Sequence, residues 1–258
     1  MIILENLKSL IFDTHAHYDD KVFSANLDDL IFSLKQSGVG GIITCGINKE
    51  TSFKAIELAE RYDIVYAAVG IHPENVEDGD KISDIKLLLN HEKCVAVGEI
   101  GLDYYWNKEN KPKQEEFFKA QLELAKEYDL PVLVHDREAH GDTLEILKQY
   151  KPKGVVHAFS GSVEMAREVI KLGLYIGVGG VLTFNNARAL PAVVKDTSIE
   201  RILLETDAPY LAPVPFRGKT NHSDYLHFVA EKMAEIKRIT KDEILTETFN
   251  NAKNLFKI

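Results

Sequence analysis

Eight short apolar runs, separated by longer amphipathic stretches, constrain the fold of this chain more than any other feature of its sequence. Each run has the length of a β-strand, is rich in Val and Ile, and is nearly continuous, as expected of strands buried on both faces. The predicted strands cover residues 10–15, 41–46, 64–71, 94–101, 131–135, 154–159, 174–180 and 201–207. Helical spacing of apolar residues predicts helices at 26–37, 50–61, 81–91, 113–128, 142–150, 162–171, 187–195, 223–236 and 241–255.

The regular alternation of these elements predicts parallel strands joined by right-handed helical crossovers. Divided over eight strands, the 258 residues give a repeat of about 32 residues, the size of one βα unit. Eight units favour an α/β fold of the (β/α)8 TIM-barrel type, formed as a single domain by residues 1–258. An open doubly wound sheet is the alternative. Such sheets usually carry a glycine-rich phosphate loop after the first strand, whereas this strand ends in His15-Ala16-His17.

Composition removes several classes of protein. The chain has 31 Lys and Arg against 40 Asp and Glu, a net charge of -9, which argues against a protein that coats nucleic acid nonspecifically. No apolar run reaches 18 residues, so we expect no membrane partner. The first 17 residues lack the basic region and cleavage site of a signal peptide. Cys45 and Cys94 cannot form a disulfide framework and are expected to be inert buried thiols. We therefore expect a cytoplasmic protein without an obligatory protein partner.

Titratable residues are concentrated where the predicted strands end. In a parallel barrel these ends form one rim, and active sites lie there. Packing alone does not explain such a set, because buried titratable groups must be paired or bind a metal. Five of the nine histidines and two carboxylates belong to it: His15, His17, His72, Glu99, His135, His157 and Asp207.

The order of the strands divides these residues between two ions. His15 and His17 are two residues apart, so both side chains should point toward the barrel axis. Asp13 has the same parity and is expected to orient a ligand histidine. Closure of the barrel brings Asp207 beside the first strand, and Glu99 lies across the barrel, where its two oxygens can bridge two metals. The predicted sites are one ion near His15, His17, Glu99 and Asp207, and another near Glu99, His135 and His157.

Seven stretches of the chain resemble the TatD family of metal-dependent deoxyribonucleases, within the amidohydrolase-like barrels. They follow the family's order: FDTHAHYDD (12–20), GIHPE (70–74), VGEIGLDYYW (97–106), VLVHDREA (132–139), VVHAFSGS (155–162), LLETDAPYLAP (203–213) and RGKTN (217–221). The resemblance implies hydrolysis of DNA phosphodiester bonds, typically by a 3′–5′ exonuclease supported by Mg²⁺. It also implies the ligands His15, His17, Glu99, His135, His157 and Asp207.

The chain departs from the family pattern at two places. Glu74 follows His-Pro where the family commonly has His, and His222-Ser223 follows Asn221 where the family usually has Glu-Pro. Neither departure touches a predicted ligand, so both concern substrate contacts at the rim rather than the chemistry.

The hypothesis for the chemistry is attack on a DNA end by a hydroxide held between two Mg²⁺ or Mn²⁺ ions, with Zn²⁺ as an alternative metal. Glu99 and Asp207 are the predicted catalytic residues, Asp207 as general base. His72 and Arg137 are candidates to bind a phosphate. For Arg137, the competing interpretation is a surface ion pair with Glu138 or Glu127.

Further candidates for substrate binding lie on two loops of the predicted rim. Arg217, Lys219 and Asn221 follow the eighth strand, and the alternative for this segment is a solvated loop. The aromatic residues 104–106 follow the fourth strand, where they could stack on exposed bases or simply pack the loop.

Two other functions compete with the nuclease. The first keeps the barrel and its metals but hydrolyses another ester or amide, such as a D-aminoacyl ester or a small phosphodiester. The second is a non-catalytic, metal-binding scaffold barrel. The complete set of ligands argues against the scaffold, because a scaffold would be free to lose one of them.

Overall fold

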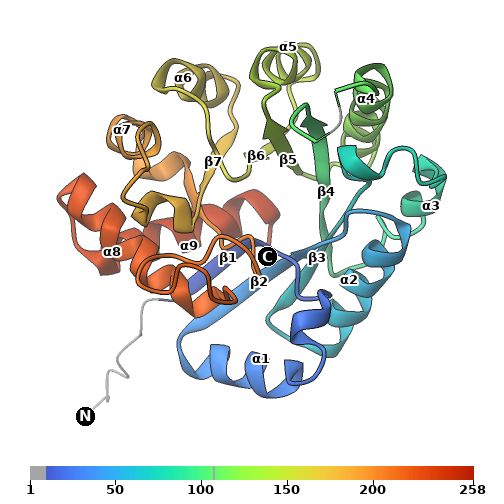
Figure 1. Ribbon diagram of the computed structural model, residues 1–258. Coiled ribbons are helices and arrows are strands. Elements are labelled where there is room, and N and C mark those ends of the chain that lie inside the picture. The colour runs from blue at the N-terminus through green and yellow to red at the C-terminus, as the bar shows by residue number, and fades with distance from the viewer. Residues whose placement is uncertain (1–9, 107) are drawn as a thin grey trace.

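The computed structural model describes residues 10–106 and 108–258, and within these residues eight strands form one parallel sheet in sequence order. Figure 1 shows the strands around a central axis with the helices outside them. The sheet confirms the predicted (β/α)8 barrel and excludes the open doubly wound alternative. The strands are β1 (Ile11–Ala16), β2 (Val39–Cys45), β3 (Val65–Val69), β4 (Cys94–Asp103), β5 (Val132–Arg137), β6 (Gly154–Val156), β7 (Tyr175–Val178) and β8 (Ile202–Leu204).

The barrel closes between β8 and β1 through a short, irregular junction. A parallel bridge joins Ala16 to Ala208, the N–H of His17 donates to the Ala208 carbonyl at 2.7 Å, and the N–H of Asp207 donates to the His15 carbonyl at 2.9 Å. These bonds lie beyond the last residue of β8, which ends at Leu204 rather than at the predicted residue 207. The junction therefore holds side by side the two segments that carry His15, His17 and Asp207, which are predicted metal ligands.

The helices agree with the predicted order, and their ends differ by a few residues. They are α1 (Leu27–Gln36), α2 (Lys49–Arg61), α3 (Ile82–Lys86), α4 (Lys111–Glu127), α5 (His140–Tyr150), α6 (Val163–Lys171), α7 (Leu190–Asp196), α8 (Leu226–Lys237) and α9 (Lys241–Phe256). Short 3-10 turns add η1 (Lys21–Phe23), η2 (Pro73–Asn75), η3 (Gly180–Thr183), η4 (Ile199–Arg201) and η5 (Ser223–Tyr225).

Local sequence signals set several of the helix ends. Ser162 caps α6 by accepting from the N–H of Met165 at 3.2 Å, as its hydroxyl predicts. Gly38 ends α1 with a φ of 93°, a left-handed conformation that glycine adopts at little cost. The helix predicted from residue 223 begins instead as η5 and becomes α-helical at Leu226.

The core consists of two apolar layers that follow the alternation of side chains along the strands. One layer fills the barrel and includes Ile43, Leu133 and Leu203. The other lies between the sheet and the helices and includes Val134 and Ile202. Helix α9 contributes Ala252 and Phe256 to the inner layer, and it lies behind the strands in Figure 1. It therefore closes the end of the barrel opposite the strand C-termini.

Among the described residues, no helix combines the length and apolar character needed to cross a membrane. Residues 1–9 lie outside the described residues. The structure therefore does not bear on two expectations that depend on them, the absence of a signal peptide and the N-terminal boundary of the domain.

Candidate metal centre

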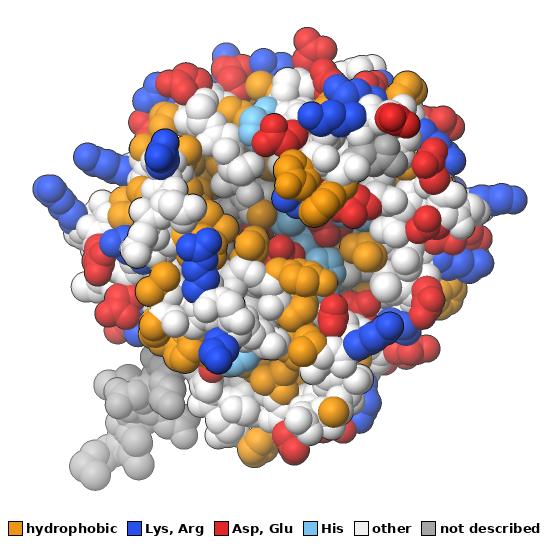
Figure 2. All heavy atoms as spheres, viewed as in Figure 1, with side chains coloured by type: hydrophobic (Ala, Val, Ile, Leu, Met, Phe, Trp, Pro, Cys, Tyr) orange, Lys and Arg blue, Asp and Glu red, His pale blue; other side chains and the backbone are white. Residues whose placement is uncertain are grey.

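The structure brings the predicted metal ligands together at the C-terminal rim of the barrel. Three overlapping groups of histidine and carboxylate residues have ligand atoms within 4.8 Å of one another. Figure 2 shows histidine and acidic side chains at the bottom of a hollow in this face, with hydrophobic side chains at its edge. The groups are His15 with Glu99 and His157, His15 with His17 and Asp207, and His72 with Glu99 and His135.

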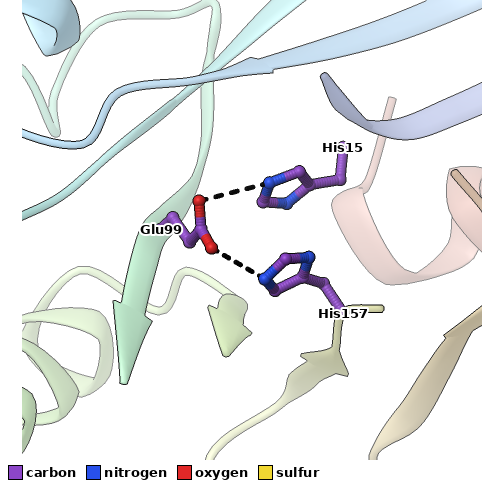
Figure 3. A group of neighbouring side chains, drawn as sticks. All are labelled: His15, Glu99 and His157. Atoms are coloured by element: carbon purple, nitrogen blue, oxygen red, sulfur yellow. Dashed lines mark ion pairs between the residues drawn. The ribbon is translucent and has the colours of Figure 1, made fainter. Parts of the chain in front are cut away.

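Glu99 is the centre of the site because its two carboxylate oxygens face different histidines. Oε2 lies 3.3 Å from Nε2 of His15 and 3.6 Å from Nε2 of His17. Oε1 lies 2.7 Å from Nε2 of His157 and 2.8 Å from Nδ1 of His135. Figure 3 shows the carboxylate pointing between the rings of His15 and His157. The two oxygens of Glu99 therefore face two different sides of the site, and the predicted bridging of two ions stays a prediction.

Hydrogen bonds on the far side of the rings determine which nitrogens face the centre. His17 donates through Nδ1 to the Cys45 carbonyl at 2.9 Å, so in the neutral ring the inward-facing Nε2 carries the lone pair. His135 donates through Nε2 to Asp103 at 3.0 Å, which leaves Nδ1 toward Glu99. Outer hydrogen bonds of this kind fix the tautomer of metal-binding histidines. Asp103 and the Cys45 carbonyl are therefore positioning groups that the sequence analysis did not assign.

His72 faces Glu99 with a different tautomer. Its Nδ1 accepts the N–H of Glu74 at 3.2 Å, so in the neutral ring Nε2 carries the proton. That Nε2 lies 3.5 Å from Oε1 of Glu99. His72 therefore presents a hydrogen-bond donor to the centre, which fits the predicted contact with a phosphate better than ligation of a metal.

His15 and His157 stack across the centre, with ring centroids 4.0 Å apart and planes 6° from parallel. Burial and the neighbouring charge of His157 lower the pKa of His15 to about 4, so this ring is neutral and has a lone pair to offer. Its Nδ1 lies 3.5 Å from the thiol of Cys45, whose pKa burial raises well above the usual value. Cys45 is thus the buried thiol expected from the sequence, and it also packs against the candidate ligand His15.

The charges of the site are strongly coupled. Burial lowers the pKa of His17, but the hydrogen bond to Asp207 and the charges of Glu99 and Asp207 outweigh it and raise the value to about 9. Burial likewise opposes the charge of His135, but hydrogen bonds to Asp103 and Glu99 raise its pKa to about 10. Burial opposes ionisation of Glu99 as well, yet the surrounding histidines hold its pKa well below the usual range.

Asp207 is placed by the loop after β8 rather than by the strand itself. Its backbone is left-handed, with a φ of 59°, and its Oδ1 lies 3.5 Å from Nε2 of His17 and 3.8 Å from Nε2 of His15. The side chain is 21% exposed. Although burial raises the pKa of Asp207, the hydrogen bond with His17 and the nearby histidine charges lower it below its usual value. Asp207 is therefore an ionised carboxylate with access to solvent.

Asn221 holds this loop and does not reach a substrate. Its side chain is fully buried, and Nδ2 donates to the carbonyls of Thr206 at 2.9 Å and Tyr210 at 2.7 Å. Asn221 therefore does not make the predicted substrate contact. It instead holds the backbone before and after Asp207, and so positions that residue. The loop folds back on residues 206–210, which follow β8, a tertiary feature that the RGKTN stretch alone does not reveal.

Asp13 also has a different role from the one predicted. The register between β1 and β2 shifts between Asp13 and Ala16, and Asp13 pairs with Ile42, which belongs to the outer apolar layer. The shift breaks the simple alternation, so Asp13 does not share the face of His15. Its carboxylate instead accepts from the Thr206 hydroxyl and the Ser223 hydroxyl, each at 2.6 Å, and from the N–H of His15 at 3.3 Å.

Arg137 and the aromatic residues that follow β4 lie together at the rim. The Arg137 guanidinium carbon is 4.2 Å from the ring centroid of Tyr105 and 5.4 Å from that of Trp106. This cation–π stack takes the place of the ion pair considered from the sequence, and Glu127 pairs with Lys86 at 2.8 Å instead.

Three further rim residues were considered for substrate binding. Two of them are exposed and remain available to a substrate, and one is buried. Arg217 and Lys219 are exposed, and the Arg217 guanidinium carbon lies 4.3 Å from the ring centroid of Phe184. Tyr104, in contrast, is buried and donates to Asp142 at 2.9 Å, so packing explains it.

The donor set fits divalent cations. Nε2 of His15 and Nε2 of His17 lie only 3.3 Å apart and face the same two carboxylates, an arrangement that a cation between them would stabilise. His157 also presents Nε2 to Oε1 of Glu99 at 2.7 Å, on the side of the ring that faces the other histidines of the group. Imidazole nitrogen and carboxylate oxygen together suit Zn²⁺, Mn²⁺ and related ions.

Comparison with known proteins identifies the family of the chain. The family described as TatD related DNase matches residues 12–257. The chain belongs to the TatD family. The uncharacterized metal-dependent hydrolase YabD of Bacillus subtilis is 43% identical over 254 residues, which cover 96% of this chain and 100% of that protein. This confirms the resemblance seen in the sequence, and the chain is a metal-dependent hydrolase of the TatD type.

Solved TatD structures have the same barrel. The crystal structure of YjjV, a TatD homologue from Escherichia coli K12, superposes with a TM-score of 0.91 at 35% identity, over 98% of this chain and 99% of that one. A TatD family hydrolase from Entamoeba histolytica superposes with a TM-score of 0.86 at 26% identity, over 96% of this chain and 98% of that one.

Proposed function

We propose that this TatD protein hydrolyses phosphodiester bonds at the ends of single-stranded or frayed DNA, in the 3′–5′ direction, with two Mg²⁺ or Mn²⁺ ions. The observation that carries the proposal is the placement of Glu99, whose two oxygens face separate sets of histidines. Paired ions suit phosphoryl transfer because, when bound, they lower the pKa of water and stabilise the attacking and leaving oxygens. His15, His17 and Asp207 would hold one ion with Glu99, and His135 and His157 would hold the other.

The protein's own residues complete the proposed reaction. Asp207, ionised and 21% exposed, accepts the proton from the attacking water as general base and can pass it to solvent. His72 donates from Nε2 to an oxygen of the phosphate. Arg137 supplies a guanidinium, whose planar fork matches phosphate oxygens, on the rim above the centre.

The net charge of -9 is compatible with a DNA substrate. Bound cations reverse the local field at the carboxylates, so a phosphate can approach the rim even though the whole molecule repels a polyanion. Weak binding of long duplexes follows from the same charge, which favours an exposed end as the substrate.

The test uses purified protein and a single-stranded oligonucleotide labelled at its 5′ end. After chelation we expect no shortening, and on addition of Mg²⁺ or Mn²⁺ we expect a ladder that shortens from the 3′ end. Glu99→Gln preserves the side-chain volume and should abolish the ladder. Glu57→Gln, on the outside of α2, is the matched control and should leave it unchanged.

A substrate panel separates this function from the alternatives. The panel contains the oligonucleotide, bis-p-nitrophenyl phosphate and a D-aminoacyl ester. Metal-dependent hydrolysis of the ester alone would replace the nuclease with another hydrolase. Tight metal binding without turnover of any of the three would favour the scaffold barrel.

A further inference from the structure

Two exposed aromatic rings lie at the rim beside the metal centre. The side chain of Tyr105 is 52% exposed and that of Trp106 is 62% exposed. Their ring centroids are 4.7 Å apart and their planes cross at 86°. Exposure of this extent costs hydrophobic free energy, so two adjacent rings that remain more than half exposed point to a ligand. Together with Arg137, we call these residues the aromatic platform.

One carboxylate connects the aromatic platform to the metal centre. Oδ1 of Asp103 accepts the N–H of Tyr105 at 2.9 Å and the N–H of Trp106 at 3.0 Å. Oδ2 of the same side chain accepts from the ligand His135 at 3.0 Å. Arg137 is joined to the same strand pair, because its carbonyl accepts the N–H of Tyr104 at 2.9 Å. The platform is therefore fixed in position relative to His135 and the candidate metal centre rather than carried on a loose loop.

The chemistry of the platform selects among possible ligands. The Arg137 guanidinium covers the Tyr105 ring at 4.2 Å and adds a positive charge next to two π faces. Positive charge beside aromatic rings is the usual surface for single-stranded nucleic acid, because every base has a π face and every nucleotide carries a phosphate. A simple ester or an inorganic phosphate would use the charge and not the rings.

We propose that the aromatic platform is a base-binding subsite, on which a nucleobase next to the scissile phosphate stacks against Trp106 and Tyr105 while Arg137 binds the neighbouring phosphate. This inference rests on the proposed function for the identity of its ligand, and it adds that recognition requires the bases and not only the backbone. An intact duplex hides these faces, so the subsite also selects for unpaired ends.

The test uses the single tryptophan of the chain, Trp106, as its own reporter. Glu99→Gln protein in Mn²⁺, which should not turn over but keeps the other candidate ligands, is titrated with a hexathymidylate and with a hexamer of the same charge that contains abasic tetrahydrofuran units. We expect the hexathymidylate to quench the fluorescence and the abasic hexamer to leave it nearly unchanged. Tyr105→Leu keeps the reporter and should weaken binding about five-fold or more, since each base–aromatic stack stabilises a complex to that extent.

A matched variant and a turnover assay complete the experiment. Trp106→Leu should raise KM for the hexathymidylate by at least about five-fold and leave hydrolysis of the abasic hexamer, which has no base to stack, unchanged. Phe32→Leu, at an aromatic residue that is 66% exposed on α1, should alter neither. Equal binding of the abasic hexamer, or an equal loss in Phe32→Leu, would overturn the subsite. Base-dependent quenching without DNA hydrolysis in the presence of metal would instead contradict the proposed function and leave the subsite standing.

Discussion

Replacing Asp103 with Asn should weaken metal binding although Asp103 is not a predicted ligand. In the structure its carboxylate makes three hydrogen bonds, to the N–H groups of Tyr105 and Trp106 and to Nε2 of His135. The amide oxygen of Asn can keep the two backbone bonds. Its NH₂ group would face the Nε2–H of His135, so the ring must move its proton to Nδ1, the atom that faces Glu99. The ligand lone pair is then lost.

The size of the effect follows from the bond that is removed. A hydrogen bond to a charged group contributes about 1.5–3 kcal/mol, and the loss of a group that orients a metal ligand typically lowers affinity about 10- to 100-fold, the same range. We expect Asp103→Asn to raise the Kd for Mn²⁺ by that factor, measured by calorimetry on chelated protein.

Asp142→Asn is the control for this measurement. Asp142 accepts from Tyr104 at 2.9 Å in the same region of the rim and has no role in the centre as described above. The Asp142→Asn protein should bind Mn²⁺ with wild-type affinity. A Kd for Asp103→Asn within about two-fold of the wild type would refute the argument from the tautomer.

The remaining predictions concern stability. A Cβ at Gly177 would lie 2.1 Å from Oε2 of Glu205, so Gly177→Ala should lower the free energy of unfolding by about 1–3 kcal/mol in urea titrations, and an unchanged midpoint would contradict the packing. Gly141→Ala, in α5 with open space around the new Cβ, should raise it by about 0.5 kcal/mol; a loss would contradict this. The hydrogen bond to Asp136 raises the pKa of His140, so its stabilisation is complete below the unfolded pKa and is lost as pH rises through the folded pKa. The difference in unfolding free energy between wild type and His140→Gln should therefore be larger at pH 5.5 than at pH 9, and the reverse order would refute the pair.

The fold and the convergence of the inward-facing candidate ligands were predictable because two periodic rules act over the whole chain. Strictly alternating strands and helices leave few topologies, and parallel strands place their C-terminal residues on one rim. His15, Glu99 and His157 needed nothing more than this rule to be brought together. Asp103 could have been found in the same way, since it lies four residues after Glu99 on the same strand and therefore on the same face.

Other features depend on contacts that no local pattern contains. The irregular register of β1 turned Asp13 away from the predicted face, and a period of two cannot anticipate such a shift. Asn221 is buried and donates hydrogen bonds to the backbone, because the loop after β8 folds back on Thr206 and Tyr210. Arg137 makes a cation–π contact rather than an ion pair with a carboxylate, because the loop after β4 places the Tyr105 ring next to its guanidinium.

Titration of chelated protein with Mn²⁺, with bound ions and DNA hydrolysis measured on the same samples, tests the central claim most directly. That claim is that Glu99 bridges two ions which the hydrolysis of DNA ends requires. We expect two ions per chain in the wild type, with turnover that rises as the second ion binds, and fewer bound ions without turnover in Glu99→Gln. Full hydrolysis of the oligonucleotide by the chelated protein, or by Glu99→Gln, would contradict the account.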